Sequence, residues 1–379
     1  MKLLRTAAYL STLSSKAYAS RAPAGPAFLP GFRFGRFSSA IRPTGIAISA
    51  SRSASRSRST FRSVGGPGRS LSSSPSSATS AFAMSARPVT ERSGDGTITV
   101  RPADEAAQSA LVVLCHGLGD SAEGFADVAE QLGAALPHVK FVLPTAPTQP
   151  VTMNMGMPMP SWYDITGLDE RSNEQCAGID VSAGRIRGIL RAEHAENGLP
   201  YSRMLLAGFS QGGALSLFVG MQSDPDDPGD GTDTLRLAGI LVMSGYLPAA
   251  SKFAIGAGLE DTPILHCHGE ADPMVRYQMA QQSREAVTGK GATRYDLKGY
   301  PGLPHSVSPQ EIADVLAYLQ EVLPPDDASN IKLKDPASMS VKELRAAIRR
   351  AGLGSQAVGL MEKSEFVKLL RDHREGGKS

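Results

Sequence analysis

The segment Gly208–Gly212, which reads Gly-Phe-Ser-Gln-Gly, places the strongest constraint on what this chain can fold into. The apolar run 203–207 before it is typical of a buried strand, and the residues 213–219 after it favour a helix. Glycine removes side chains where a backbone must turn sharply between two such elements. The pattern therefore predicts a strand–turn–helix unit that presents the Ser210 hydroxyl as a nucleophile, rather than a purely structural glycine-rich turn.

Residues 89–324 alternate between short apolar runs and helix-like segments. Strands are expected at 110–115, 140–143, 203–207, 238–243 and 263–268, and helices at about 125–136, 179–196 and 309–323, with a long loop over 144–164. This alternation predicts an α/β protein in which helices cover both faces of a mostly parallel central sheet. Such sheets bind ligands at the carboxyl ends of their strands, which is where the Ser210 turn lies.

Charge is distributed unevenly along the 379 residues. Residues 1–90 contain 13 Lys or Arg and no Asp or Glu, whereas residues 88–324 contain 15 basic and 29 acidic residues. An acidic body argues against nucleic acid as a partner. The composition predicts four parts: a disordered leader over 1–85, a catalytic domain over 89–324, a linker over 325–335 and a small helical tail over 336–379.

The leader is rich in Arg and Ser and lacks acidic residues, which is the composition of a mitochondrial or plastid transit peptide. An organelle is therefore the expected location. The alternative is a cytoplasmic form that starts at Met84. No apolar run approaches the ~20 residues of a membrane-spanning helix, so no transmembrane segment is expected.

The three cysteines, Cys115, Cys176 and Cys267, cannot all pair with one another. Cys115 and Cys267 lie in apolar runs, where a buried free thiol is the usual state. No CxxC or Cys/His spacing typical of a metal site occurs, so no metal is expected.

A serine nucleophile needs a base within hydrogen-bond reach and a carboxylate that orients the base. In hydrolases of this architecture the chain order is Ser, acid, His. His305 lies in a loop just before the last helix of the body, which makes it the predicted base. Asp272 directly follows a strand and is the predicted acid, with Glu270 second. His266 and His268 lie inside that strand and are predicted to be core residues.

The reaction also needs backbone donors for the oxyanion of the tetrahedral intermediate. One is the N–H of Gln211, the residue after the nucleophile. The second is expected from the loop that follows the strand at 110–115, at the N–H of Leu118. His116 is predicted to hold this loop in place.

With these residues identified, the body resembles the acyl-protein thioesterase/lysophospholipase/carboxylesterase family of α/β-hydrolases. The matching segments are His116–Asp120, Leu143–Pro147, Met157–Asp164, Gly208–Gly213, His268–Val275 and His305–Ser306. The resemblance implies the roles given above for Ser210, Asp272, His305, Leu118 and Gln211, and it implies no cofactor.

The resemblance also implies a substrate class. It indicates hydrolysis of fatty-acyl thioesters on protein cysteines, which is depalmitoylation, through an acyl-enzyme intermediate. The alternative is a carboxylesterase or lysophospholipase that acts on small esters or lysolipids. Acylated proteins or lysolipids would then be the partners, with transient contact at a membrane surface. A remote alternative is a non-catalytic scaffold that works through its tail.

A methionine-rich stretch lies in the 144–164 loop. Flexible methionine side chains suit an adaptable acyl channel, and we therefore predict a substrate-binding role for them and for the neighbouring tryptophan. The residues are Met153, Met155, Met157, Met159 and Trp162. The alternative is that these side chains fill gaps beneath the loop.

The tail carries two helix signals. Ser340 and Glu343 form a capping box before one apolar helix, and a second helix begins near Ser364. The pair resembles SAP-like helix–loop–helix modules. We expect a tail that packs on the body or binds a protein partner, whereas nucleic-acid binding is not expected from a net charge of +3 over residues 325–379.

Overall fold

The computed structural model describes residues 87–167, 174–224 and 235–376. The predicted leader over 1–85 therefore lies outside the described residues, so the structure does not bear on it.

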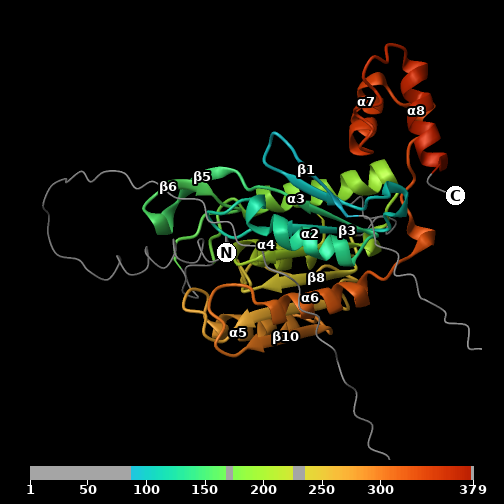
Figure 1. Ribbon diagram of the computed structural model, residues 1–379. Coiled ribbons are helices and arrows are strands. Elements are labelled where there is room, and N and C mark those ends of the chain that lie inside the picture. The colour runs from blue at the N-terminus through green and yellow to red at the C-terminus, as the bar shows by residue number, and fades with distance from the viewer. Residues whose placement is uncertain (1–86, 168–173, 225–234, 377–379) are drawn as a thin grey trace, which may run out of the picture. The chain divides into compact units, whose positions relative to one another are not determined.

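The sheet in Figure 1 forms the centre of the body. It has eight strands, in the order β1-β2-β4-β3-β7-β8-β9-β10. Its strands are β1 (Val89–Arg92), β2 (Ile98–Arg101), β3 (Ala110–Cys115), β4 (Val139–Leu143), β7 (Met204–Phe209), β8 (Gly239–Met243), β9 (Ile264–Gly269) and β10 (Tyr295–Tyr300). β2 pairs antiparallel with β1 and β4, and all other pairs are parallel. The predicted mostly parallel sheet is confirmed.

Helices cover both faces of this sheet. They are α2 (Ala126–Ala135), α3 (Ile179–Asn197), α4 (Gln211–Gly220), α5 (Tyr277–Gly289) and α6 (Pro309–Val322). Successive residues of β3 are buried on opposite faces, as the two-residue period of a strand requires. One apolar layer joins the sheet to α3, α4 and α5, and the other joins it to α2 and α6.

The long loop expected over 144–164 is partly wrong, because it contains a hairpin of β5 (Thr148–Val151) and β6 (Met157–Pro160). The sequence interpretation also lacked β1, β2, α5 and β10. β10 reads Tyr-Asp-Leu-Lys-Gly-Tyr and alternates between half-buried and exposed positions along most of its length. An edge strand of this kind has no continuous apolar run, so it gives a weak signal.

The segment predicted as a linker is hydrogen-bonded to the body. The Ile331 N–H donates to the Gln108 carbonyl at 2.8 Å, and the Lys332 N–H donates to the Asn197 carbonyl at 3.0 Å. Short 3-10 turns occupy Glu105–Ala107, Ala122–Phe125, Thr152–Asn154, Tyr201–Arg203, Asp327–Ser329 and Pro336–Ser338.

The tail contains the two expected helices, α7 (Val341–Arg350) and α8 (Lys363–Gly376). Ser340 and Glu343 form the predicted capping box at the start of α7. Leu344, Ile348, Phe366 and Leu370 are buried in an apolar cluster of the tail itself. Across the described parts of the chain, no helix combines the length and apolar character that crossing a membrane requires.

Candidate active site

Ser210 lies at the carboxyl end of β7, where the chain turns directly into α4. Its φ of 53° is a left-handed value that is rare for a residue with a side chain, and its N–H donates to the Met243 carbonyl at 2.8 Å. A Cβ at Gly212 would lie 2.2 Å from the Cys115 carbonyl oxygen, and one at Gly208 would lie 2.3 Å from the Gly212 backbone. The predicted strand–turn–helix unit is confirmed, and close backbone approach explains both glycines.

The structure brings the three predicted triad residues together. His305 Nε2 lies 3.0 Å from Ser210 Oγ, and His305 Nδ1 lies 2.6 Å from Asp272 Oδ2. Because a carboxylate accepts hydrogen bonds, Nδ1 carries the imidazole proton and donates it. Nε2 is then free to accept the Ser210 hydroxyl proton. Asp272 and His305 are each only 5% exposed, so water has little access to the bond between them.

The loops that carry the acid and the base are fastened to each other. They follow the neighbouring parallel strands β9 and β10, and the Ala271 N–H donates to the Leu303 carbonyl at 3.1 Å. A Cβ at Gly269 would lie 2.2 Å from that same carbonyl oxygen. Glu270, the second candidate acid, is exposed, whereas His305 Nδ1 is bonded to Asp272.

The loop after β3 lies beside the nucleophile. A Cβ at Gly117 would be 3.4 Å from the Ser210 Cβ, and the Gly119 N–H is held by the Pro160 carbonyl at 2.8 Å. Leu118 lies between these two glycines. Gln211 is the first residue of α4, where backbone N–H groups have no acceptor within the helix. The two predicted oxyanion donors therefore belong to segments that flank Ser210.

His116 is part of this loop's support, as predicted. Its Nδ1 donates to the Gly117 carbonyl at 2.7 Å, and its Nε2 accepts the Ala146 N–H at 2.9 Å. These two partners fix one neutral tautomer. Burial lowers the pKa of His116 to about 4, so the ring stays neutral at physiological pH.

The five residues predicted to bind substrate differ widely in exposure. Trp162 is fully buried and its indole N–H donates to the His116 carbonyl at 2.8 Å. Met159 is 9% exposed and its sulfur would lie 3.7 Å from a Cβ on Gly119, while Met153 packs on the core. Met155 and Met157, by contrast, are 87% and 38% exposed.

The Gln211 side chain has a structural role that the sequence interpretation missed. Its Nε2 donates to the Tyr163 carbonyl at 2.8 Å, and its Oε1 accepts the Trp162 N–H at 3.0 Å. These bonds fasten the end of the β5–β6 hairpin segment to the nucleophile turn. The acceptor and donor are backbone groups about 50 positions away, so no local sequence pattern predicts these bonds.

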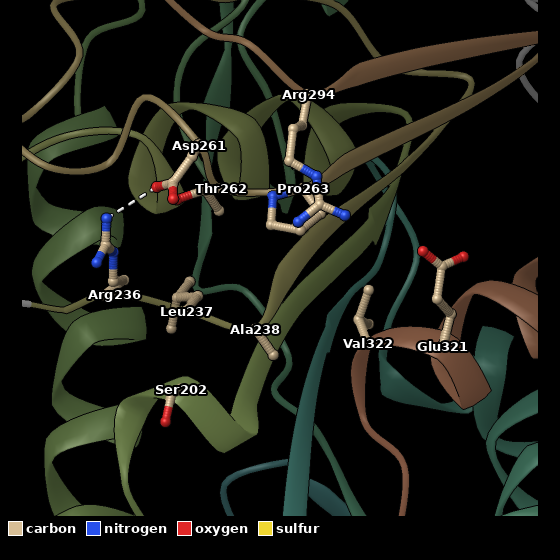
Figure 2. A pocket seen from close by; sticks show the side chains of 10 residues that line it. All are labelled: Ser202, Arg236, Leu237, Ala238, Asp261, Thr262, Pro263, Arg294, Glu321 and Val322. Atoms are coloured by element: carbon tan, nitrogen blue, oxygen red, sulfur yellow. Dashed lines mark hydrogen bonds and ion pairs between the residues drawn. The ribbon is translucent and has the colours of Figure 1, made fainter.

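A separate cavity of about 370 Å³ lies away from this site (Figure 2). Its lining residues come mostly from segments that precede strands: Ser202 precedes β7, Ala238 precedes β8, Pro263 precedes β9 and Arg294 precedes β10. It therefore opens at the amino ends of the parallel strands, opposite Ser210. In sheets of this type chemistry is found at the carboxyl ends, so the Ser210 site is the candidate active site.

The arrangement is suited to acyl transfer. It contains a nucleophile bonded to a base, a base bonded to an acid, and two backbone segments placed to stabilise an oxyanion. Within 87–167, 174–224 and 235–376, no three His, Cys, Asp or Glu side chains gather in a way that would hold a metal ion.

Known proteins resemble this chain over the body. The model of the phospholipase/carboxylesterase family matches residues 97–323. Acyl-protein thioesterase 1 of Mycosarcoma maydis is 37% identical over 243 residues, which cover 60% of this chain and 97% of that protein. Acyl-protein thioesterase 1 homolog 1 of Dictyostelium discoideum is 37% identical over 217 residues, which cover 57% of this chain and 92% of that protein.

A solved structure agrees with these sequence matches. The crystal structure of Zea mays acyl-protein thioesterase 2 has a TM-score of 0.50 and 30% identity, and the match covers 60% of this chain and 98% of that one. The body therefore has the α/β-hydrolase fold. The chain belongs to the phospholipase/carboxylesterase family, and it is a serine hydrolase. The family match ends at residue 323 and so leaves the tail out.

Proposed function

We propose that this serine hydrolase removes fatty-acyl groups from protein cysteines by cleaving their thioesters. The observation that carries the proposal is the line of hydrogen bonds from Ser210 through His305 to Asp272. The relatives named acyl-protein thioesterases support the choice of substrate, because this chain covers almost their whole length.

The geometry supports a two-step reaction. Ser210 Oγ attacks the thioester carbonyl while His305 Nε2 takes its proton, and Asp272 stabilises the imidazolium. The N–H groups of Leu118 and Gln211 hold the oxyanion. Collapse of the tetrahedral intermediate releases the cysteine thiol, which receives the proton from His305. Water then attacks the acyl-Ser210 ester while His305 takes its proton. The second tetrahedral intermediate collapses, Ser210 Oγ receives the proton from His305, and the fatty acid is released.

The acyl chain is proposed to run beside the oxyanion loop, where Met159 lies against Gly119. Burial of an acyl chain contributes ~0.8 kcal/mol per CH₂, so even partial cover favours long chains. In this assignment Met153 and Met159 contact the chain near the carbonyl, while Met155 and Met157 extend the apolar surface outward. Trp162 contributes by holding the loop.

The second candidate function is hydrolysis of lysolipids or small esters, which the family description also supports. The deciding measurement is kcat/KM on palmitoyl-cysteine peptides, lysophosphatidylcholine and a short p-nitrophenyl ester, with Ser210→Ala as the background control. The proposal expects the palmitoyl peptide to be the best substrate. Turnover confined to the short ester would exclude the thioesterase function, and preference for the lysolipid would establish the alternative.

Transient contact with a membrane surface follows from a lipid-linked substrate. Met155 is 87% exposed beside the exposed Met157, and exposed apolar side chains of this kind favour partition into a lipid interface. Vesicles of phosphatidylcholine should co-sediment the protein, and Met155→Asp should weaken that binding. Equal binding by both proteins would remove this part of the proposal.

The tail is proposed to contact a protein partner. Val358 and Met361 are 82% and 85% exposed between α7 and α8, although the tail has its own apolar cluster. Proximity labelling in cells should change when both residues are replaced by Asp. An unchanged set of neighbours, or tight binding of duplex DNA by the wild type at physiological salt, would contradict a protein-contact role.

The location is proposed to be a mitochondrion or plastid, on the composition of residues 1–85. A fluorescent protein fused after residue 85 should accumulate in that organelle. A diffuse cytosolic signal would favour the form that starts at Met84.

A further inference from the structure

Two buried histidines lie behind the acid of the triad. His266 and His268 occupy alternate positions of β9, so their side chains share one face of the strand, and neither is exposed. His268 Nε2 lies 2.7 Å from the Val275 carbonyl oxygen. Because a carbonyl only accepts, Nε2 carries the proton of the neutral ring.

The other ring nitrogens continue this bond into a chain. With Nε2 of His268 protonated, its Nδ1 accepts from His266 Nε2 in a long bond of 3.3 Å. His266 Nδ1 then accepts the Tyr295 hydroxyl at 2.8 Å. Burial lowers the pKa of both imidazoles, which keeps the two rings neutral. Every donor in the chain therefore points from β10 through β9 toward the loop that carries Asp272.

The last hydrogen bond of this series ends at Val275, which also bonds to Asp272. The N–H of Val275 donates to Asp272 Oδ1 at 2.9 Å, and the N–H of Met274 donates to the same oxygen at 2.8 Å. His268 thus anchors Val275 by its carbonyl, while Asp272 accepts from the N–H of that same residue. His268 Nε2 also lies 3.6 Å from Asp272 Oδ2, the oxygen that His305 uses.

We infer that His268 is a positioning residue for Asp272. It holds the Met274–Val275 backbone so that one carboxylate oxygen is occupied by N–H groups and the other is presented to His305. His266 and Tyr295 keep His268 in the tautomer that this requires. The inference rests on the assignment of Ser210, His305 and Asp272 as the triad, and it does not depend on which acyl group is the substrate.

The test uses steady-state kinetics on a short p-nitrophenyl ester. His268→Leu should lower kcat by about 10–100-fold, with little change in KM. This is the range seen when a residue that orients a metal ligand is removed, and we take it as the measure for a residue that orients Asp272. His268→Gln keeps an N–H that can reach the Val275 carbonyl, so it should recover most of kcat. His268→Asn is too short to reach it and should resemble Leu.

A matched control separates positioning from loss of stability. Leu265 lies on the same strand, is 5% exposed and faces the opposite apolar layer. Leu265→Ala should lower the melting temperature but leave kcat per folded molecule unchanged, with the folded fraction taken from circular dichroism.

The possible results lead to different conclusions. Wild-type kcat in His268→Leu, or an equal loss in Leu265→Ala at the same folded fraction, would overturn the positioning role. If His268→Leu does not fold, equal kcat in the Gln and Asn variants would overturn it instead. A wild-type protein that fails to hydrolyse the ester would overturn the triad assignment, which is a separate outcome.

Discussion

The two ends of the parallel strands carry similar residue types in very different surroundings. At the carboxyl ends, a part-buried hydrogen bond joins Ser210 to His305, and a buried one joins His305 to Asp272. At the amino ends, Ser202 borders the cavity of Figure 2, where Arg236 and Asp261 form an ion pair of 2.9 Å with side chains 57% and 64% exposed. An exposed ion pair contributes only ~0–1 kcal/mol and does not fix the positions of its side chains. Hydrogen bonds in a low dielectric are electrostatically stronger and fix the groups that they join.

The largest effect is expected when one serine is replaced at each end of the parallel strands. Ser210→Ala should lower kcat by on the order of 10⁶, because the nucleophile and its base act as a unit. Ser202→Ala should leave kcat unchanged. Ester hydrolysis and labelling by a fluorophosphonate probe measure both variants, and retained labelling of Ser210→Ala would contradict the assignment.

Asp272→Asn tests the orientation of the base. An amide in place of the carboxylate leaves the packing intact but favours the wrong tautomer of His305, and kcat should fall by ~10⁴. Asp261→Asn is the matched control at the amino ends. A loss below tenfold in Asp272→Asn would show that another group, with Glu270 the first to examine, orients His305.

Gly212→Ala tests the close approach beneath the nucleophile. A Cβ there would lie 2.2 Å from the Cys115 carbonyl oxygen, so α4 or β3 must shift, and we expect a loss of at least ~3 kcal/mol in the free energy of unfolding. Gly184→Ala, inside α3 with open space around its Cβ, should instead be neutral or stabilising by ~0.5–1 kcal/mol. Urea unfolding of the two variants measures the difference, and equal effects would mean that the turn tolerates a side chain.

Glu311 tests the consequences of burial for a charge near the His305 loop. It is fully buried at the start of α6, and burial raises its pKa to about 8 from the ordinary 4.5. The folded state therefore holds a proton that the unfolded state has lost, so the free energy of unfolding should fall as pH rises from 4.5 to 8.

Glu311→Gln should remove that fall. Relative to wild type, the Gln variant should gain stability at pH 9 compared with pH 5, by an amount on the order of a few kcal/mol. Urea unfolding at both pH values checks this. A constant difference between the two proteins would show that Glu311 titrates as an ordinary carboxyl group.

The smallest effect is expected at the amino ends of the parallel strands, where the ion pair is exposed. Arg236→Ala removes the ion pair to Asp261 and should change the free energy of unfolding by less than ~1 kcal/mol, with no change in kcat. Raising the salt concentration should abolish even this difference. A tenfold loss of activity would show that the amino-end cavity is coupled to catalysis.

The sequence was sufficient where a signal is local. The apolar run before Ser210, the glycines around it and the capping box at Ser340 each lie within a few residues, and the structure confirms the elements they predict. The order of Ser210, Asp272 and His305 along the chain also anticipated a triad that the fold brings together.

The sequence was insufficient where a contact is made only in the folded state. The Gln211 side chain bonds to backbone groups of the hairpin segment, and His268 bonds to the Val275 carbonyl. A backbone group can belong to any residue type, so the sequence does not reveal which backbone group a side chain will bond to. The exposure of Met155 and the burial of Trp162 likewise depend on how the β5–β6 hairpin folds, which a count of methionines does not reveal.

The most direct test of the account is to trap the acyl-enzyme. The wild-type protein is mixed with a palmitoyl-cysteine peptide, quenched in acid within the first turnover and mapped by mass spectrometry. A palmitoyl ester is expected on the peptide that contains Ser210, and it should be absent in Ser210→Ala. Release of the peptide thiol without an adduct on Ser210, or an adduct on another residue such as Ser202, would contradict it.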